Sequence, residues 1–217
     1  MSRSILPKVF TWMCLGLLLT FATGYILSLN PIAIVNMARS FGGWGMLILM
    51  IIELGLVIFL SARITKMSPL TAKLSFLLYA FITGLTFSSI FVAYDIKNVI
   101  FVFLITSIVF ALFAVIGATT KVDLSKIGTY LMMALIAILI CIVVNIFMQN
   151  SMLDLIISIV CVIIFIGFTA YDVQNVLALD AAGALGEENL AIYGALQLYL
   201  DYINIFINLL DIFNNRN

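Results

Sequence analysis

Polar side chains recur at helical spacing along the last hydrophobic stretch of the chain, residues 190–213. The steps between them are four, three, four and three residues, and they are Gln197, Asp201, Asn204, Asn208 and Asp211. Side chains three or four positions apart lie on the same side of an α-helix. The stretch therefore predicts a helix with one polar face, whose oxygen atoms suit a hydrated path for a cation. Bonding of the amides to neighbouring helices is the alternative interpretation.

The composition indicates what surrounds this polar face. Hydrophobic residues make up 65% of the chain and charged residues 9%, and the mean hydropathy is +1.29. Soluble domains contain about a quarter charged residues, so the sequence predicts an all-α polytopic membrane protein in a lipid bilayer. At roughly 20 residues a span, the chain has room for about six to eight helices in one transmembrane bundle domain, residues 1–217. Ten basic residues balance ten acidic ones, which gives no reason to expect a nucleic-acid partner.

Residue types that the sequence lacks argue against several classes of membrane protein. The chain has no histidine, which argues against an intramembrane serine protease with a histidine base. No lysine follows Lys126, which argues against a retinal protein. The cysteines Cys14, Cys141 and Cys161 lie in apolar runs, so disulfides are not expected and each is predicted to be a buried small apolar side chain. We expect a protein that is not an enzyme and needs no obligatory cofactor, with a secondary transporter as a further alternative.

Seven apolar stretches are long enough to cross a membrane. They cover residues 9–29, 44–64, 70–93, 98–118, 127–148, a sixth stretch from about residue 152 to well past Asp172, and the polar-faced residues 190–213. Residues 30–43 are expected to form a loop, because Asn30-Pro31 opens the segment and Gly42-Gly43 closes it. Residues 180–189 are expected to form an acidic connection between the last two spans.

Lysine and arginine are distributed unevenly between the two sides of these spans. If the N-terminus is inside, the outer connections hold only Arg39 and Lys97. The inner segments then hold seven basic residues, which are Arg3, Lys8, Arg63, Lys66, Lys73, Lys121 and Lys126. The positive-inside rule therefore predicts a cytoplasmic N-terminus.

Ionisable side chains fall within or near the predicted spans at four positions, Glu53, Arg63, Asp172 and Asp201. Each costs about 2.5–3.5 kcal/mol at a helix centre, so each needs a partner or a wet cavity. Asp172 and Asp201 flank the same inner connection at depths of about 12 and 18 Å, and can therefore face each other. Two such carboxyls share a proton and titrate as a unit, or bind a Ca²⁺ ion when deprotonated. The alternative is that each caps a kink or bonds a neighbouring helix.

Arg63 and Glu53 each allow two interpretations. Arg63 either extends to the lipid headgroups or forms a latch to Asp172 or Asp201 that protonation would weaken. Glu53 lies about 15 Å along the helix from Arg63, so the two do not pair within it. Glu53 is expected either to line a conduction path or to be a protonated glutamate that is hydrogen-bonded to another helix.

The motifs that carry these residues resemble those of a known family. Residues 198–210, LYLDYINIFINLL, are similar to the C-terminal signature of the Bax inhibitor-1 family, the transmembrane Bax inhibitor motif proteins. Tyr171-Asp172 and the second span, from Glu53-Leu54 to residues 61–64, match as well. The likeness covers most of the chain, and the short termini favour a bacterial member of the inner membrane.

The resemblance implies a seven-helix bundle with the last helix at its centre. It implies a pH-sensitive Ca²⁺ leak, in which Asp172 and Asp201 sense protons and Arg63 takes part in closure. The ions would pass along Glu53 and the face that carries Asn204, Asn208 and Asp211, with Ca²⁺ permeating or binding transiently. Some bacterial relatives are instead linked to a membrane-bound ATP-dependent protease. A regulator that conducts nothing and has such a protease as partner is therefore the alternative function.

Overall fold

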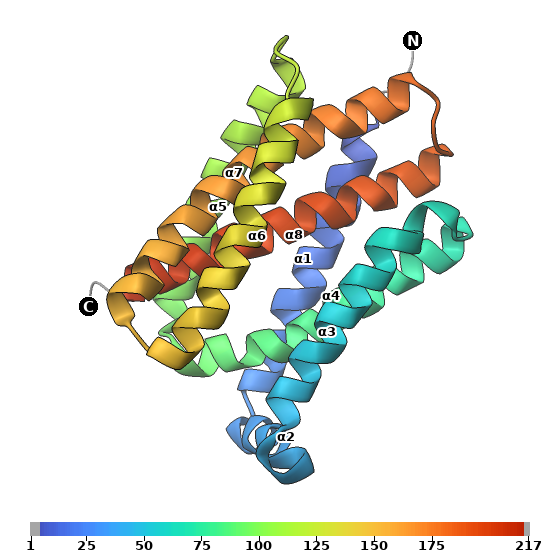
Figure 1. Cartoon of the computed structure of the whole chain (residues 1–217). Helices are drawn as coiled ribbons and strands as arrows, with labels where there is room; N and C mark the ends of the chain where they lie inside the picture. The colour runs from blue at the N-terminus through green and yellow to red at the C-terminus, as the bar shows by residue number, and fades with distance from the viewer. Residues whose placement is uncertain (1–4, 215–217) are drawn as a thin grey trace. The chain divides into compact units, whose positions relative to one another are not determined.

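The computed structural model describes residues 5–214, apart from the side chain of Phe41, and these residues are almost entirely helical (Figure 1). The helices are α1 (Leu6–Ser28), α2 (Pro31–Gly43), α3 (Gly45–Arg63), the short 3-10 helix η1 (Ile64–Lys66), α4 (Pro69–Ala93), α5 (Ile96–Thr119), α6 (Ser125–Met148), α7 (Ser151–Ala181) and α8 (Glu187–Asn214). Residues 5–214 contain no strand. Arg3, one of the residues predicted to face the cytoplasm, lies outside this range.

Seven helices in the described part are long and apolar enough to cross a membrane: α1, α3 with η1, and α4 to α8. This confirms the predicted all-α polytopic fold, and the predicted span boundaries agree with the helix ends to within a few residues. Local sequence accounts for several ends. Ser68 Oγ accepts a hydrogen bond from the Thr71 amide at 3.2 Å and caps α4, with Pro69 in its first turn.

The prediction of a loop over residues 30–43 is wrong, because Pro31–Gly43 form helix α2. Asn30 caps this helix, since its Oδ1 accepts a hydrogen bond from the Ala33 amide at 3.3 Å. Pro31 fits the first turn, where a missing N–H costs nothing. Gly42 and Gly43 then end the helix at φ angles of 73° and 95°, which residues with a side chain rarely adopt.

The connection between the last two spans is shorter than the predicted residues 180–189. Helix α7 continues to Ala181 and includes Asp180, and α8 begins at Glu187. Gly183 turns the chain with a φ of 60°. Glu187 and Glu188 therefore lie in the first turn of α8, where the helix dipole favours acidic side chains.

The chain divides into two compact units. The first unit comprises residues 1–96 and 182–199, and the second comprises residues 97–181 and 200–217. The first holds α1 to α4 and the start of α8, and the second holds α5 to α7 and the rest of α8. Because α8 continues from one unit into the other, this division does not decide the predicted single domain, which stays a prediction.

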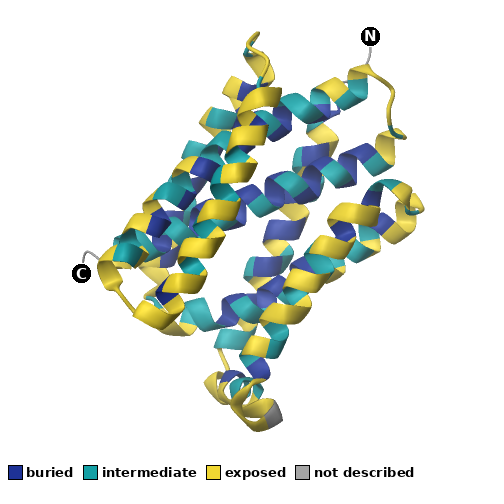
Figure 2. Cartoon of the chain, in the orientation of Figure 1, coloured by how far each residue is buried: buried dark blue, intermediate teal, exposed yellow. Residues whose placement is uncertain are grey.

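Helix α8 is the most buried of the candidate spans. In its most apolar window 72% of the residues are buried, against 6% for α6 and 39% for α4 and α7. Figure 2 accordingly shows α8 mostly in the colour of buried residues and α6 largely in that of exposed ones. The polar-faced α8 is thus largely buried while the apolar α6 is largely exposed, as is expected in a bilayer because polar groups are costly in hydrocarbon. The central position of α8 stays a prediction.

Candidate functional site

The two aspartates expected to meet do lie together in the second unit. Asp172 on α7 and Asp201 on α8 are 5% and 4% exposed, and their side chains hydrogen-bond to each other. A hydrogen bond between two carboxyl groups needs a proton from one of them, so at this contact the two groups are placed to share a proton. Asp201 Oδ2 is buried and has no hydrogen-bond partner in the described part of the chain. It is therefore an acceptor that a proton or a cation can satisfy.

Close packing fixes α7 and hence the position of Asp172. A Cβ added to Gly117 on α5 would overlap the backbone of Ala170, so only glycine permits this approach of α5 to α7. A Cβ added to Gly128 on α6 would overlap the side-chain ring of Tyr171. Since these contacts involve the two residues directly before Asp172, they determine which way its carboxyl points.

Gln174, two residues after Asp172 on α7, is hydrogen-bonded to the connection between α5 and α6. Its Oε1 accepts a hydrogen bond from the Leu124 amide, and its Nε2 donates to the Val122 carbonyl, each at 2.8 Å. Within that connection the Ser125 amide donates to Asp123 Oδ1 at 2.9 Å. The hydrogen bonds from Ser125 hold the pKa of the exposed Asp123 carboxyl below its ordinary value.

Tyr202 sets the rotation of α8 next to Asp201. Its hydroxyl donates to the Phe103 carbonyl of α5 at 3.0 Å and lies 2.8 Å from Ser107 Oγ. The ring meets Phe103 and Phe110 edge-on, with 5.5 Å between centroids in each case. Because Tyr202 directly follows Asp201, this anchor leaves the carboxyl little freedom to turn away from α7.

The asparagines of the polar face use their donors within α8. Asn204 Nδ2 donates to the Leu200 carbonyl and Asn208 Nδ2 to the Asn204 carbonyl, each at 2.8 Å. Only the NH₂ of an amide can bond a carbonyl, so both Oδ1 atoms are directed elsewhere. Together with the half-buried Asp211, this face offers acceptor oxygens. Such a face suits a cation and not an anion.

Glu53 and Arg63 belong to the first unit. Glu53 on α3 is half-buried, and its Oε2 accepts a hydrogen bond from Thr86 Oγ1 of α4 at 3.1 Å. The expected polar partner on another helix is therefore present. Arg63 is exposed in the last turn of α3 and forms no ion pair with the described residues of its own unit. The latch and the conduction role both stay predictions.

Two anchors of α8 were missed in the sequence, Tyr202 and Tyr199. In the first unit the Tyr199 hydroxyl lies 2.6 Å from Thr20 Oγ1, which donates to the Ala80 carbonyl at 2.8 Å. Because the threonine proton is used there, Tyr199 is the donor to Thr20. Both tyrosines belong to the motif of residues 198–210, but their partners lie far away in sequence.

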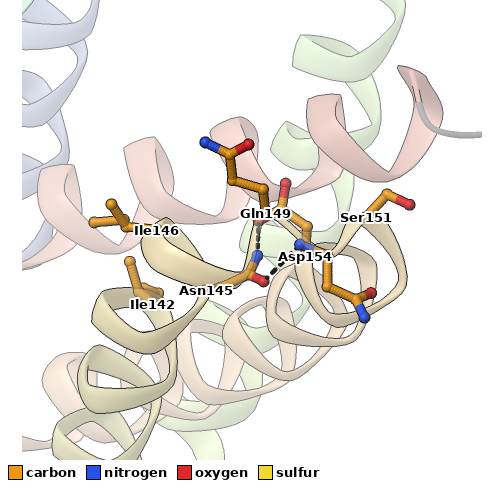
Figure 3. A pocket seen from close by; sticks show the side chains of 7 residues that line it. Ile142, Asn145, Ile146, Gln149, Ser151 and Asp154 are labelled. Carbon is orange, nitrogen blue, oxygen red and sulfur yellow. Dashed lines mark hydrogen bonds between the residues drawn. The ribbon is translucent and has the colours of Figure 1, made fainter.

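A separate hollow of about 380 Å³ lies at the turn between α6 and α7 (Figure 3). Its polar groups bond one another. Asn145 Nδ2 donates to Asp154 Oδ1, and Asn145 Oδ1 accepts from the Asn150 amide, each at 3.1 Å. Asn150 Oδ1 in turn caps α7. These hydrogen bonds stabilise the turn between α6 and α7, so the hollow is explained as part of this helix hairpin.

No group of three or more Cys, Asp or Glu side chains in residues 5–214 is arranged to hold a metal ion. Asp172 and Asp201 supply two carboxyl groups, whereas a resident Ca²⁺ ion takes six to eight oxygen ligands.

Seven helices that are long and apolar enough to cross a membrane, together with a buried carboxyl pair, define a polytopic α-helical membrane protein with a protonatable site. A family model described as "Inhibitor of apoptosis-promoting Bax1" matches residues 2–217. The chain belongs to this family, the Bax inhibitor-1 family.

Relatives of similar length are found in several bacteria. The chain is 40% identical over 218 residues to an uncharacterized protein of Borreliella burgdorferi, covering 99% of this chain and 93% of the relative. It is 39% identical over 220 residues to the inner membrane protein YbhL of Escherichia coli K12, covering 99% and 92%. An uncharacterized protein of Deinococcus radiodurans is 38% identical over 216 residues, covering 99% and 91%.

Proposed function

We propose that the protein is a pH-sensitive calcium leak channel of the bacterial inner membrane, gated by Asp172, Asp201 and Arg63. The observation that carries the proposal is the buried contact between Asp172 and Asp201, in which Asp201 Oδ2 has no hydrogen-bond partner among residues 5–214. A buried pair of carboxyl groups is suited to binding protons and cations. The inner-membrane location is carried over from the relative YbhL.

The gating step follows from counting protons on the pair. In contact, the two carboxyls share one proton and carry one negative charge, with which Arg63 pairs in the closed state. A second proton makes the pair neutral and releases Arg63, so the leak increases as the pH falls. Asp172 lies nine residues before the end of α7 at Ala181, or about 14 Å along the helix, nearer its predicted cytoplasmic end. The cytoplasmic pH therefore controls the gate.

The path for the ion uses the oxygen atoms of α8. Asn204, Asn208 and Asp211 present acceptors at successive turns beyond Asp201, and Glu53 adds a carboxyl on α3. Spacing of one turn, about 5.4 Å, lets a cation move from one oxygen group to the next. Ca²⁺ binds transiently at Asp172 and Asp201 and is not a resident cofactor.

Reconstituted flux tests this proposal. Purified protein in liposomes should pass Ca²⁺ faster at pH 6 than at pH 8, by at most about tenfold per pH unit for a single controlling proton. Asp201→Asn and Asp172→Asn should each lose the wild-type pH dependence of the flux, because the remaining carboxyl has no second carboxyl with which to share a proton. Arg63→Gln should do the same, whereas Arg39→Gln on α2 is the matched control and should keep the wild-type profile.

Two results would refute the channel. Unaltered pH dependence in both aspartate variants removes the carboxyl pair as sensor. No flux from the folded wild-type protein, together with co-purification of a membrane-bound ATP-dependent protease, establishes the non-conducting regulator instead.

A further inference from the structure

Three helix starts of the first unit meet around one open pocket of about 350 Å³. It is lined by Pro7, Lys8, Thr11, Trp12, Lys73, Glu188 and Ala191, which come from α1, α4 and α8. Each helix begins only a few residues away, at Leu6, Pro69 and Glu187. The first turns of membrane-spanning helices lie at the level of the lipid headgroups, where tryptophan and lysine are favoured. The pocket therefore faces the headgroup layer.

The charged side chains in this pocket are paired, but they keep free bonding capacity. Lys73 Nζ donates to Glu188 Oε2 at 2.9 Å and lies 5.7 Å from the centroid of the Trp12 ring. Lys8 Nζ lies 2.7 Å from Glu187 Oε1. An ammonium group has three donors and a carboxylate several acceptor positions, so each keeps bonds for a ligand. All four charged side chains are solvent-accessible, at 26–57%.

The charges alternate in sign, and this selects the ligand. Lys8 and Lys73 are available to a phosphate oxygen, while Glu188 and the face of Trp12 attract an ammonium group. A simple anion would be repelled by the glutamates, and a simple cation by the lysines. A phosphodiester that carries its own primary ammonium group satisfies both.

Apolar surface continues from the pocket along the same helices. Leu15 and Leu18, four and seven residues after Thr11, are 45% and 67% exposed on α1. Leu77, four residues after Lys73, is half-buried on α4, and α1 packs along α4. Acyl chains can lie on these leucines while the headgroup occupies the pocket. This favours a lipid over a soluble phosphate compound.

We propose that this pocket of α1, α4 and α8 binds the headgroup of a zwitterionic phospholipid of the phosphatidylethanolamine type. Lys8 and Lys73 hold the phosphate, and Glu188 with Trp12 holds the ammonium group. The site is separate from Asp172 and Asp201, and it does not depend on ion conduction.

The two tryptophans of the chain, Trp12 and Trp44, allow a direct measurement. In a Trp44→Phe variant, Trp12 alone fluoresces, and lipids with brominated acyl chains quench it when they are adjacent. Two sets of liposomes are compared, one with brominated phosphatidylethanolamine and plain phosphatidylcholine, and one with plain phosphatidylethanolamine and brominated phosphatidylcholine. The difference in quenching gives the relative occupancy of the site by the two lipids. We expect phosphatidylethanolamine to be preferred about threefold to tenfold, the range for a few partly exposed charge contacts.

Substitutions test the phosphate contact and the ammonium contact of the pocket separately. Lys73→Gln should abolish the preference, and Lys73→Arg should largely retain it. Glu188→Gln should shift the preference towards brominated phosphatidylglycerol, because the phosphate contact survives and the ammonium contact is lost. Lys66→Gln, on η1 in the same unit but outside the pocket, is the matched control and should behave as wild type. An unchanged gel-filtration profile and helical circular dichroism confirm folding, and Glu188→Gln tests the proposal even if Lys73→Gln fails to fold.

Four results would overturn the assignment. They are equal quenching by all headgroups, a wild-type preference for phosphatidylglycerol, displacement of the brominated lipid by soluble glycerophosphoethanolamine, and the same preference reported by Trp44 in a Trp12→Phe variant. The first and last mean that no selective site exists at Trp12. The second means that phosphate alone is recognised, and the third that the ligand is soluble.

Discussion

At the scale of single residues, Asp201 lies between two anchoring tyrosines. Tyr199 donates to Thr20 in the first unit, and Tyr202 donates to the Phe103 carbonyl in the second. Each bond fixes the rotation of α8 about its own axis, because a helix cannot turn without moving every side chain on it. Within the second unit, the Tyr202 hydroxyl one residue away thus helps to place the carboxyl of Asp201.

Removing one hydroxyl tests this positioning. Tyr202→Phe should lower stability by about 0.5–1.5 kcal/mol, the usual net value of one hydrogen bond. It should also shift the pH midpoint of Ca²⁺ flux, because Asp201 is held less firmly against Asp172. The exposed Tyr130→Phe on α6 is the control and should change neither quantity. A normal midpoint in a measurably destabilised Tyr202→Phe protein would make the tyrosine purely structural.

At the scale of helices, the contact of α5 with α7 depends on Gly117. Gly117→Ala should cost about 1–3 kcal/mol, because its Cβ would overlap the rigid backbone of Ala170 and the helices must separate. Gly55→Ala on α3 is the matched control, since a Cβ there meets no atom within 4 Å. That change should be neutral or slightly stabilising, because alanine favours a helix. Unfolding in SDS titrations measures both, and equal stability of the two variants would contradict the close contact.

Asp123, in the connection between α5 and α6, is expected to make the stability of the protein depend on pH. Bonds from Ser125 lower the pKa of Asp123 in the folded state. A lowered pKa means that the ionised carboxylate stabilises the fold above the unfolded value of 3.8, and that this contribution is lost as the pH falls through the lower folded value. Asp123→Ala should therefore be less stable than wild type at pH 7, and the difference should shrink below pH 4. A difference that persists undiminished at pH 3 would assign it to lost packing.

At the scale of the whole molecule, spans and the carboxyl pair were predictable but the supporting contacts were not. Long apolar runs define spans by composition, and Asp172 and Asp201 flank one short connection, so their depths follow from counting residues. Gln174 bonds an amide 50 residues away, and Tyr202 a carbonyl 99 residues away. No local pattern specifies such partners. Helix α2 was missed because Asn30-Pro31 begins a helix as readily as it ends one.

The orientation of the chain is the remaining prediction at this scale. Arg39 and Lys97 are the two basic residues assigned outside, and Lys121 is assigned inside. In a background without Cys14, Cys141 and Cys161, a membrane-impermeant maleimide added to intact cells with a permeable outer membrane should label Arg39→Cys and Lys97→Cys but not Lys121→Cys. Permeabilising the inner membrane should make the third position reactive, which controls for its accessibility.

The reverse labelling pattern would place the N-terminus outside. The end of α7 nearer to Asp172 would then face away from the cytoplasm, and the gate would respond to external pH. Ca²⁺ flux distinguishes a gate that responds to cytoplasmic pH from one that responds to external pH. It is measured in liposomes whose inner and outer pH are set independently and in which the orientation of the protein is known. Acidification of the compartment that Lys121 faces should open the leak, because that compartment supplies the second proton to Asp172 and Asp201.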